Sequence, residues 1–175
     1  MDFKTNNIVK AGLFLAFGLI LPYAFHMTGM AGAVFLPMHI PVLLCGFILG
    51  EKYGVLIGFV TPFLNSVLTG MPPIYPIGIS MALELATYGF VAGWLYRNRK
   101  INVWVSLIIA MLLGRFVSGV ANYILLTFGG KSFVLQMFLV SAFIKSIWGI
   151  IIQLITIPLI IKAVEKTKGV VSVNG

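Results

Sequence analysis

The sequence is poor in charge, and acidic residues are its scarcest polar group. Of 175 residues only 9% are charged, with four Asp and Glu against 12 Lys and Arg. A soluble domain of average composition has about 25% charged residues. The chain is 60% hydrophobic with a mean hydropathy of +1.08, and a core of this length cannot hide so much apolar surface. The composition excludes an ordinary water-soluble domain and indicates an integral membrane protein.

Cysteine and histidine are nearly absent as well. Cys45 is the only cysteine, which excludes an intrachain disulfide and makes a cysteine-based metal site unexpected. The two histidines, His26 and His39, have no flanking carboxylates in the sequence. We therefore expect no metal ion, and no motif calls for a cofactor.

The usual catalytic and nucleic-acid signatures are missing too. The segment Gly130-Lys131-Ser132 resembles the end of a phosphate-binding loop, but Leu125 occupies the place of its first glycine. No G-x-S-x-G elbow occurs, and no second catalytic group accompanies the one acid of the interior helices. The net charge of +8 is not arranged as a basic stripe with stacking aromatics. We expect neither an enzyme nor a nucleic-acid partner.

What the sequence does contain is a series of apolar runs, most of them near the length of about 20 residues that crosses a bilayer. They predict an all-α polytopic membrane protein, a single domain over residues 1–175 with six transmembrane helices. The expected helices are Ile8–Phe25, Pro37–Gly50, Tyr53–Leu68, Tyr75–Tyr96, Val103–Phe128 and Phe133–Val164.

The loop charges predict the orientation. Cytoplasmic loops carry an excess of Lys and Arg, and only Lys131 falls in a loop on the opposite side. Both termini are therefore expected in the cytoplasm, as an even number of helices requires. The nine cations assigned to that side are Lys4, Lys10, Lys52, Arg97, Arg99, Lys100, Lys162, Lys166 and Lys168.

Three charges remain for the membrane interior, namely Glu84, Arg115 and Lys145. An ionised group in hydrocarbon is costly, so each needs a partner or water. Glu84 and Arg115 lie at comparable depth and either form a bracing ion pair or belong to a ligand site. Lys145 is then left for the carboxylate or phosphate of a ligand, unless its side chain extends to the outer surface.

Polar residues repeat at helical spacing around these charges, and one face of a helix carries residues three and four apart. Such faces on the fourth, fifth and sixth helices predict a cavity that opens outward. The Met71–Pro76 turn would form its stiff rim and the Met27–Pro41 segment a pliable flap, although both could be ordinary loops. The faces comprise Ser80, Glu84 and Tyr88, then Arg115, Ser118, Gly119 and Asn122, then Ser141, Lys145 and Trp148.

Small residues recur every four positions, a spacing that lets helix backbones approach closely. Gly46, Gly50, Gly54 and Gly58 span the second and third helices, which indicates internal packing. Gly12 and Ala16 form a pair of the same kind on the first helix. These small residues either serve packing within the chain, or the patch of Gly12 and Ala16 on the first helix docks another membrane subunit.

An ordered series of motifs along nearly the whole chain resembles a known family. The segments are LPMHIPVLLCGFILGEKYGVLIGF, TPFLNSVLTGMPPIYP, ELATYGFVAGWLYR, GRFVSG and GIIIQLITIPLIIKAVEK. They resemble the substrate-binding S component of energy-coupling factor (ECF) vitamin transporters. The branch they resemble most includes carriers of folate, pantothenate and hydroxymethylpyrimidine.

The resemblance implies a bacterial plasma-membrane protein that binds a small vitamin or precursor in an outward cavity and has no ATPase of its own. It implies association with a membrane T component and two ABC-type ATPase subunits. Gly12 and Ala16 resemble the docking motif of the first helix in that family. Glu84 and Gly114-Arg115 look like features of the whole branch, which implies a bracing role.

Specificity is then expected from less general positions. Lys145 favours an anionic ligand such as pantothenate or a folate, and Trp148 and Tyr88 favour a flat ring. The alternative function is a self-contained ion-coupled carrier or channel in which Glu84 titrates. The remaining candidate ligand residues are Asn122, Tyr75, Met71, His39 and Asn65.

Overall fold

The structure is a computed structural model that describes residues 3–27 and 32–173, with side chains described over 5–25 and 34–167. All regular structure in these residues is helical. The chain runs through α1 (Phe3–Met27), α2 (Gly32–Phe35), α3 (His39–Leu49) and α4 (Glu51–Thr69). It continues through η1 (Ile74–Gly78), α5 (Ile79–Gly93), η2 (Trp94–Asn98) and α6 (Val103–Phe128), and ends with α7 (Leu135–Leu139), η3 (Val140–Lys145) and α8 (Ile147–Val173).

Local signals explain several helix ends. The Asn102 side chain accepts a hydrogen bond of 2.8 Å from the Trp104 amide and caps α6, satisfying a donor that the first turn would leave unpaired. Gly70, with φ +74°, ends α4 in the left-handed conformation that glycine adopts without strain. Gly50, with φ +101°, separates α3 from α4, and the two helices pack against each other.

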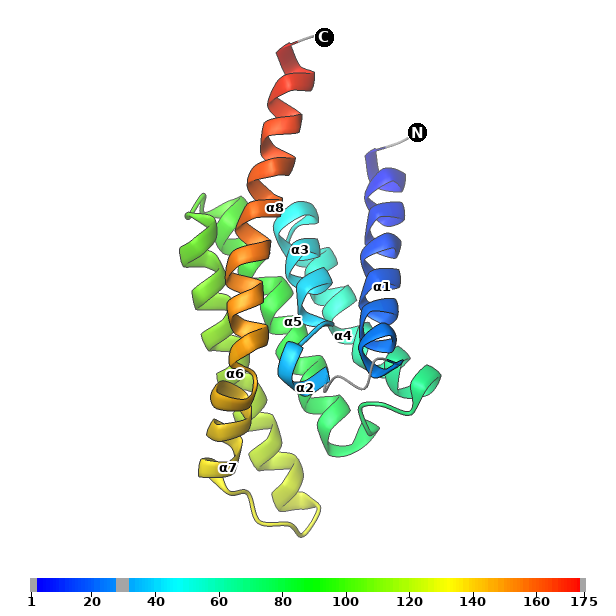
Figure 1. The fold of residues 1–175 in the computed structure, drawn as a ribbon, viewed down its shortest axis with the longest axis vertical. Helices are drawn as coiled ribbons and strands as arrows, with labels where there is room; N and C mark the ends of the chain where they lie inside the picture. The colour runs from blue at the N-terminus through cyan, green and yellow to red at the C-terminus, as the bar shows by residue number, and fades with distance from the viewer. Residues whose placement is uncertain (1–2, 28–31, 174–175) are drawn as a thin grey trace.

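Helix α5 lies at the centre of the bundle and packs against α3, α4 and α6 (Figure 1). Its glycines make that packing close. A Cβ atom at Gly89 would lie 2.3 Å from the carbonyl carbon of Gly54, and one at Gly46 would lie 2.5 Å from the carbonyl oxygen of Gly89. A Cβ at Gly58 would meet the backbone of Leu85 at 2.4 Å. The glycine spacing seen in the sequence thus serves internal packing, as predicted.

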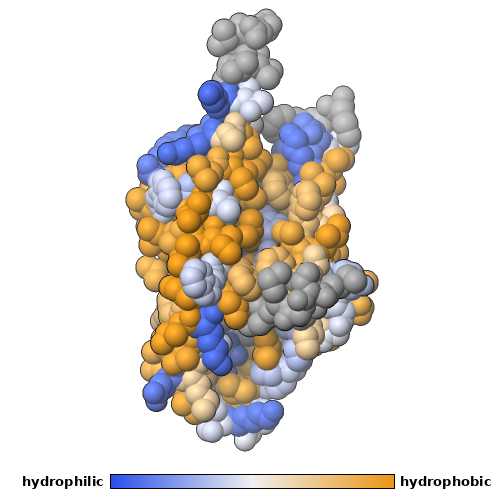
Figure 2. Space-filling view, in the orientation of Figure 1, coloured by the Kyte–Doolittle hydropathy of each residue, from blue (hydrophilic) through white to orange (hydrophobic). Residues whose placement is uncertain are grey.

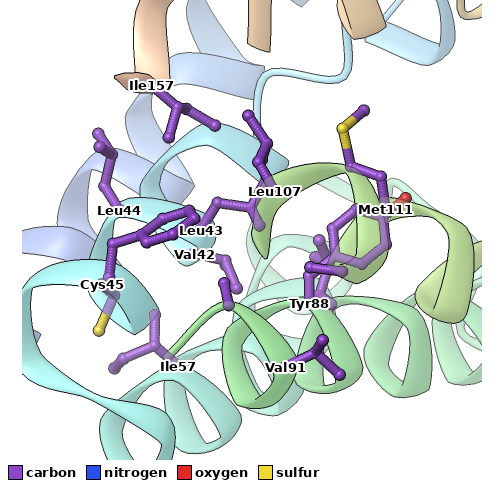
Figure 3. Close-up of a cluster of buried hydrophobic side chains, with 14 of the residues drawn as sticks. Val42, Leu43, Leu44, Cys45, Ile57, Tyr88, Val91, Leu107, Met111 and Ile157 are labelled. Atoms are coloured by element: carbon purple, nitrogen blue, oxygen red, sulfur yellow. The ribbon is translucent and has the colours of Figure 1, made fainter. Parts of the chain in front are cut away.

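The hydrophobic core lies between α3, α5, α6 and α8 (Figure 3). Leu43, Tyr88, Leu107 and Ile157 have no exposed surface. The outer surface is also apolar, and Figure 2 shows hydrophobic residues over most of the visible face, with hydrophilic ones gathered towards the two ends. A bundle that is apolar inside and outside is expected of a protein whose solvent is lipid.

Four stretches in the described part of the chain are long and apolar enough to span a membrane: Thr5–Phe25, Ile74–Asn98, Val103–Phe128 and Ile147–Thr167. They confirm the first, fourth and fifth expected helices and most of the last one. The expected second helix, Pro37–Gly50, corresponds to α3, which is shorter with 11 residues. The expected third helix corresponds to α4, which has 19 residues but is not among the four stretches. The start of α1 and the end of α8 lie at the same end of the molecule (Figure 1).

The prediction of one continuous helix over Phe133–Val164 is wrong. The chain forms a short helix α7 and the wider π-helical turn of η3, and Ser146 leaves helical geometry at φ −90° and ψ 11° before α8 begins. A π-turn inserts one extra residue, so faces on either side of it no longer follow a spacing of three and four. The apolar run carries no proline or glycine at this break, and its hydropathy alone could not reveal it.

Candidate ligand-binding site

Polar side chains from α3, α5 and α6 meet at the carboxylate of Glu84. Its Oε1 atom lies 2.8 Å from Nη1 of Arg115 and accepts a 3.0 Å hydrogen bond from the Tyr88 hydroxyl. The Nε2 atom of His39 lies 3.7 Å from the same oxygen, which is too long for a hydrogen bond. Glu84 and Arg115 are 4% and 9% exposed, so the predicted ion pair exists and is buried.

Arg115 also connects this cluster to the last part of the chain. Its Nη2 atom donates to the Ser146 hydroxyl at 3.4 Å, and that hydroxyl donates to the Ala142 carbonyl at 2.5 Å. Since Ser146 joins η3 to α8, the guanidinium holds α5, α6 and that junction together. We call Glu84, Tyr88, Arg115, His39 and Ser146 the central polar cluster.

Part of the hydrogen-bonding capacity in this region is unused. Among the described residues, the buried side-chain atoms without a hydrogen-bond partner are both ring nitrogens of His39, Nε of Arg115 and both amide atoms of Gln153. Leaving a buried polar group unpaired costs about 1–3 kcal/mol. The cluster is therefore not fully satisfied by the chain itself.

A cavity of about 410 Å³ lies between α6 and the α7–η3 segment, with Arg115 among its lining residues. We call it the α6–α7 cavity. Its wall is largely apolar, with five aromatic residues among its eleven lining residues, and the rings of Tyr123 and Phe133 pack edge to face with centroids 5.8 Å apart. Aromatic walls with few polar groups are typical of small-molecule pockets of about 300–1,000 Å³. The aromatic lining residues are Phe116, Tyr123, Phe133, Phe138 and Phe143.

Four of the ten candidate ligand residues, Glu84, Arg115, Tyr88 and His39, come together in the central polar cluster. The shared face of Ser80, Glu84 and Tyr88 is buried as expected. On α6, Ser118 is buried one turn beyond Arg115. Asn122 is half-buried, and its amide donates to the Ser118 carbonyl at 2.8 Å. The polar faces of α5 and α6 therefore converge.

The third face does not join them. Lys145 is exposed at the end of η3, and Trp148 is 61% exposed on α8. The extra residue in η3 rotates the chain, so Ser146 instead of Lys145 points at Arg115. The expectation that Lys145 is a buried cation facing the cavity is wrong, because its side chain reaches the surface.

The remaining candidates lie elsewhere. The Asn65 amide donates to the Gly18 carbonyl at 3.0 Å and ties α4 to α1. The Tyr75 hydroxyl donates to the Leu125 carbonyl, which fastens the turn before α5 to the end of α6. Met71 is exposed on that turn. The expected flap over Met27–Pro41 includes residues 28–31, outside those described.

The proposed docking pair lies on an open face of α1. Gly12 is exposed, and a Cβ atom there would meet nothing within 4 Å. Ala16 is half-buried one turn later. Helix α1 packs against α3 and α4 with its other side, so the patch is free for another helix.

Sequence reasoning missed two buried polar side chains, Ser146 in the central polar cluster and Gln153 on α8. Ser146 was hidden by the assumption of a regular helix through η3. Gln153 is completely buried on α8, and an amide within the apolar run of 147–161 was the available signal. Over 3–27 and 32–173, no three His, Cys, Asp or Glu side chains group as metal ligands would.

Comparison with protein-family models places the chain in a known family. Neither a search of curated proteins nor a search of solved structures returned a match. A scan against protein-family models matched residues 6–161, almost the whole chain, to the family described as ECF transporter, substrate-specific component. With its apolar helical bundle and an incompletely satisfied polar cluster beside a cavity, the chain belongs to the substrate-specific components of ECF transporters.

Proposed function

We propose that this chain binds a small water-soluble vitamin or vitamin precursor at the outer side of a bacterial plasma membrane and carries it inward. The family match supports a vitamin-type ligand. The observation that carries the proposal is the position of Arg115, which belongs to both the central polar cluster and the lining of the α6–α7 cavity. A guanidinium at that boundary can bind a carboxylate while the aromatic wall holds the rest of the ligand.

The ligand we favour combines a carboxylate with an apolar or flat body, as pantothenate and folate do. Arg115 uses Nη1 on Glu84 and Nη2 on Ser146, and its Nε has no partner in the described residues. Both ring nitrogens of His39, in the same cluster, also lack a hydrogen-bond partner among the described residues. These three atoms suit the polar groups of such a ligand, and the aromatic wall favours a flat ring, hence folate over pantothenate.

The proposed topology has six helices crossing the membrane and both termini in the cytoplasm. It is supported by the common position of the start of α1 and the end of α8 (Figure 1). Arg97 in η2 and Arg99 and Lys100 just after it precede α6, while Lys131 follows α6. The positive-inside preference of membrane proteins then orients the molecule.

The chain is proposed to act with a T component in the membrane and two ABC-type ATPase subunits, which hydrolyse the ATP. It has no nucleotide-binding motif of its own, since Leu125 replaces the required first glycine before Gly130-Lys131-Ser132. Binding by the isolated chain therefore needs no ATP, and uptake needs the whole assembly.

Native mass spectrometry of the chain purified without added ligand tests the proposal, because a carried-over vitamin is identified by its mass. Titration with folate and with pantothenate follows, with no ATP and no partner. We expect tight binding of one of them, and uptake into liposomes only with the coupling subunits. Unaided uptake, with no partner recovered in a native pull-down, contradicts this function. Proton-coupled flux by the pure chain that Glu84→Gln abolishes would instead favour a self-contained carrier.

Lys145 remains a proposed ligand contact, as an exposed cation next to Ser146 of the central polar cluster. It has no ion-pair partner among the described residues and is exposed, so Lys145→Ala should leave the melting temperature unchanged and weaken ligand binding. Lys131→Ala, which also removes an exposed cation after α6, is the matched control and should change neither. Unchanged affinity in Lys145→Ala removes this residue from the site.

A further inference from the structure

A second cavity lies at the other end of the bundle, far from the aromatic wall of the first. It has a volume of about 390 Å³ and is bounded by the end of α3, by η2 with the turn that follows it, and by α8. We call it the α3–α8 cavity. Its polar lining residues are Tyr96, Arg97, Lys100 and Glu165. Nothing in the proposed transport of a vitamin uses these residues.

The two cations of the α3–α8 cavity have donors to spare. Arg97 uses one Nη1 hydrogen on the Ile48 carbonyl at 3.1 Å, at the last turn of α3. A guanidinium has five N–H donors, so most of them remain free. Lys100 forms no ion pair with any described residue, and the one acid of the cavity, Glu165, accepts from the Tyr96 hydroxyl instead. The arrangement leaves a net positive charge facing the cavity.

The other walls of the cavity are apolar. Phe47 contributes from α3, and Ile161 and Val164 contribute from α8. At the same end of the bundle, the guanidinium carbon of Arg99 lies 4.8 Å from the centre of the Trp94 ring, over its face. Tryptophan and tyrosine gather at the level of lipid headgroups, so Trp94 and Tyr96 indicate that this cavity lies at the membrane surface. Figure 2 shows hydrophilic residues adjoining hydrophobic ones at the end where α8 leaves the bundle.

We propose that the α3–α8 cavity binds the phosphate headgroup of an anionic membrane lipid. Arg97 and Lys100 face the phosphate, and the partly exposed side chains of Ile48, Ile101 and Val164 contact the first part of the acyl chains. Basic pockets between helices at the cytoplasmic surface bind acidic headgroups in this way. A soluble phosphate ester would use the two cations and leave the apolar wall exposed, which is why the lipid is the better match. The inference rests on the proposed orientation and does not depend on the vitamin site.

Glu165 limits the headgroup charge that the α3–α8 cavity accepts. With two cations and one carboxylate, the cavity carries one net positive charge, which suits a lipid with one negative charge such as phosphatidylglycerol. The carboxylate also repels any second negative charge on the headgroup. Replacing it removes that repulsion, so Glu165→Gln should increase the retention of anionic lipid.

Native mass spectrometry of the full chain in micelles tests the site, with phosphatidylglycerol and phosphatidylcholine of identical acyl chains supplied in equal amounts. We expect phosphatidylglycerol to be retained preferentially. Losing one direct contact between a cation and a phosphate weakens binding by about tenfold or more, so Arg97→Gln and Lys100→Gln should each reduce retention by about that factor. If Arg97→Gln unfolds because its bond to Ile48 is lost, Lys100→Gln still tests the site.

Arg99→Gln is the matched control, because Arg99 lies between the two cations in sequence but stacks on Trp94 and does not line the cavity. It should change lipid retention by less than a factor of about two. An equal loss in Arg99→Gln and Lys100→Gln would indicate attraction to the whole surface and overturn the proposal. Equal retention of phosphatidylcholine, or displacement of the lipid by inorganic phosphate, would overturn it as well.

Discussion

The buried ion pair of Glu84 and Arg115 lies at the centre of the central polar cluster, and we expect it to stabilise the fold. Removing one partner leaves the other charge buried, at a cost of about 3–5 kcal/mol. Glu84→Ala and Arg115→Ala should therefore each lower the melting temperature strongly in detergent. The double variant Glu84→Leu/Arg115→Met should lose much less than the sum of the single losses, because no charge is left without a partner.

The control for this pair is Thr87→Ala, a half-buried position on the same helix whose hydroxyl donates to the Leu83 carbonyl of its own helix. It should melt as the wild type does. Wild-type melting in both single alanine variants would show that the ion pair does not hold the bundle together.

At the scale of residues, the sequence predicted the members of this cluster that are rare in apolar helices. An isolated acid and an isolated arginine in neighbouring spans must find partners, so Glu84 and Arg115 could be paired without a structure. Tyr88 followed from its spacing to Glu84. Ser146 could not be predicted, because a serine bonded to its own helix is common and only the register break after Lys145 turns it towards Arg115.

At the scale of helices, close glycine contacts hold α5 against its neighbours. A methyl group at Gly89 would lie 2.3 Å from the carbonyl of Gly54. Because this neighbour is a backbone atom of α4, it can give way only if the helices themselves move apart. Overpacking of this kind costs about 1–3 kcal/mol or more. Gly89→Ala should therefore lower the melting temperature, although alanine is the better helix former by about 1 kcal/mol.

Gly12→Ala provides the matched comparison, since it is the same exchange in a helix with nothing within 4 Å of the new methyl group. It should melt at or above the wild-type temperature because only the gain in helix propensity remains. If Gly89→Ala behaves in the same way, the α4–α5 contact is not as close as the structure has it.

The helices themselves were predictable to different degrees. The expected fifth helix, Val103–Phe128, coincides with α6 because Asn102 and the Gly129-Gly130 pair mark its two ends. The predicted sixth helix is interrupted at η3 and Ser146, where the sequence has no asparagine or glycine pair to mark a break. Apolar composition predicts that a segment is buried in lipid, but the hydrogen-bonding register within it depends on packing against α6.

At the scale of the whole molecule, the proposed orientation can be tested by labelling single cysteines introduced into the loops. Cys45 is the only cysteine and has no exposed surface, so the wild type should not react with a membrane-impermeant maleimide. Lys131→Cys should be labelled in intact cells, and Arg99→Cys only after the membrane is opened. The reverse pattern would place both termini outside.

The proposed docking of the T component uses the face of α1 that the described part of the chain leaves open. Small residues at a spacing of four allow a second helix to approach closely, and Gly12 and Ala16 are such a pair on a helix that leaves most of its residues unburied. We expect Gly12→Leu and Ala16→Leu to reduce co-purification with the T component and ATP-dependent uptake. Ligand binding by the isolated chain should be unchanged, because neither residue contacts the central polar cluster.

Ala163→Leu is the control for bulk, since Ala163 is an exposed small residue on α8 and should leave assembly intact. Loss of assembly in all three variants would point to a general effect of added volume in the membrane. Intact assembly in both α1 variants would place the T component on another face. Loss of ligand binding together with assembly would mean that α1 supports the site itself, in which case its link to α4 through Asn65 and Gly18 becomes the structural route.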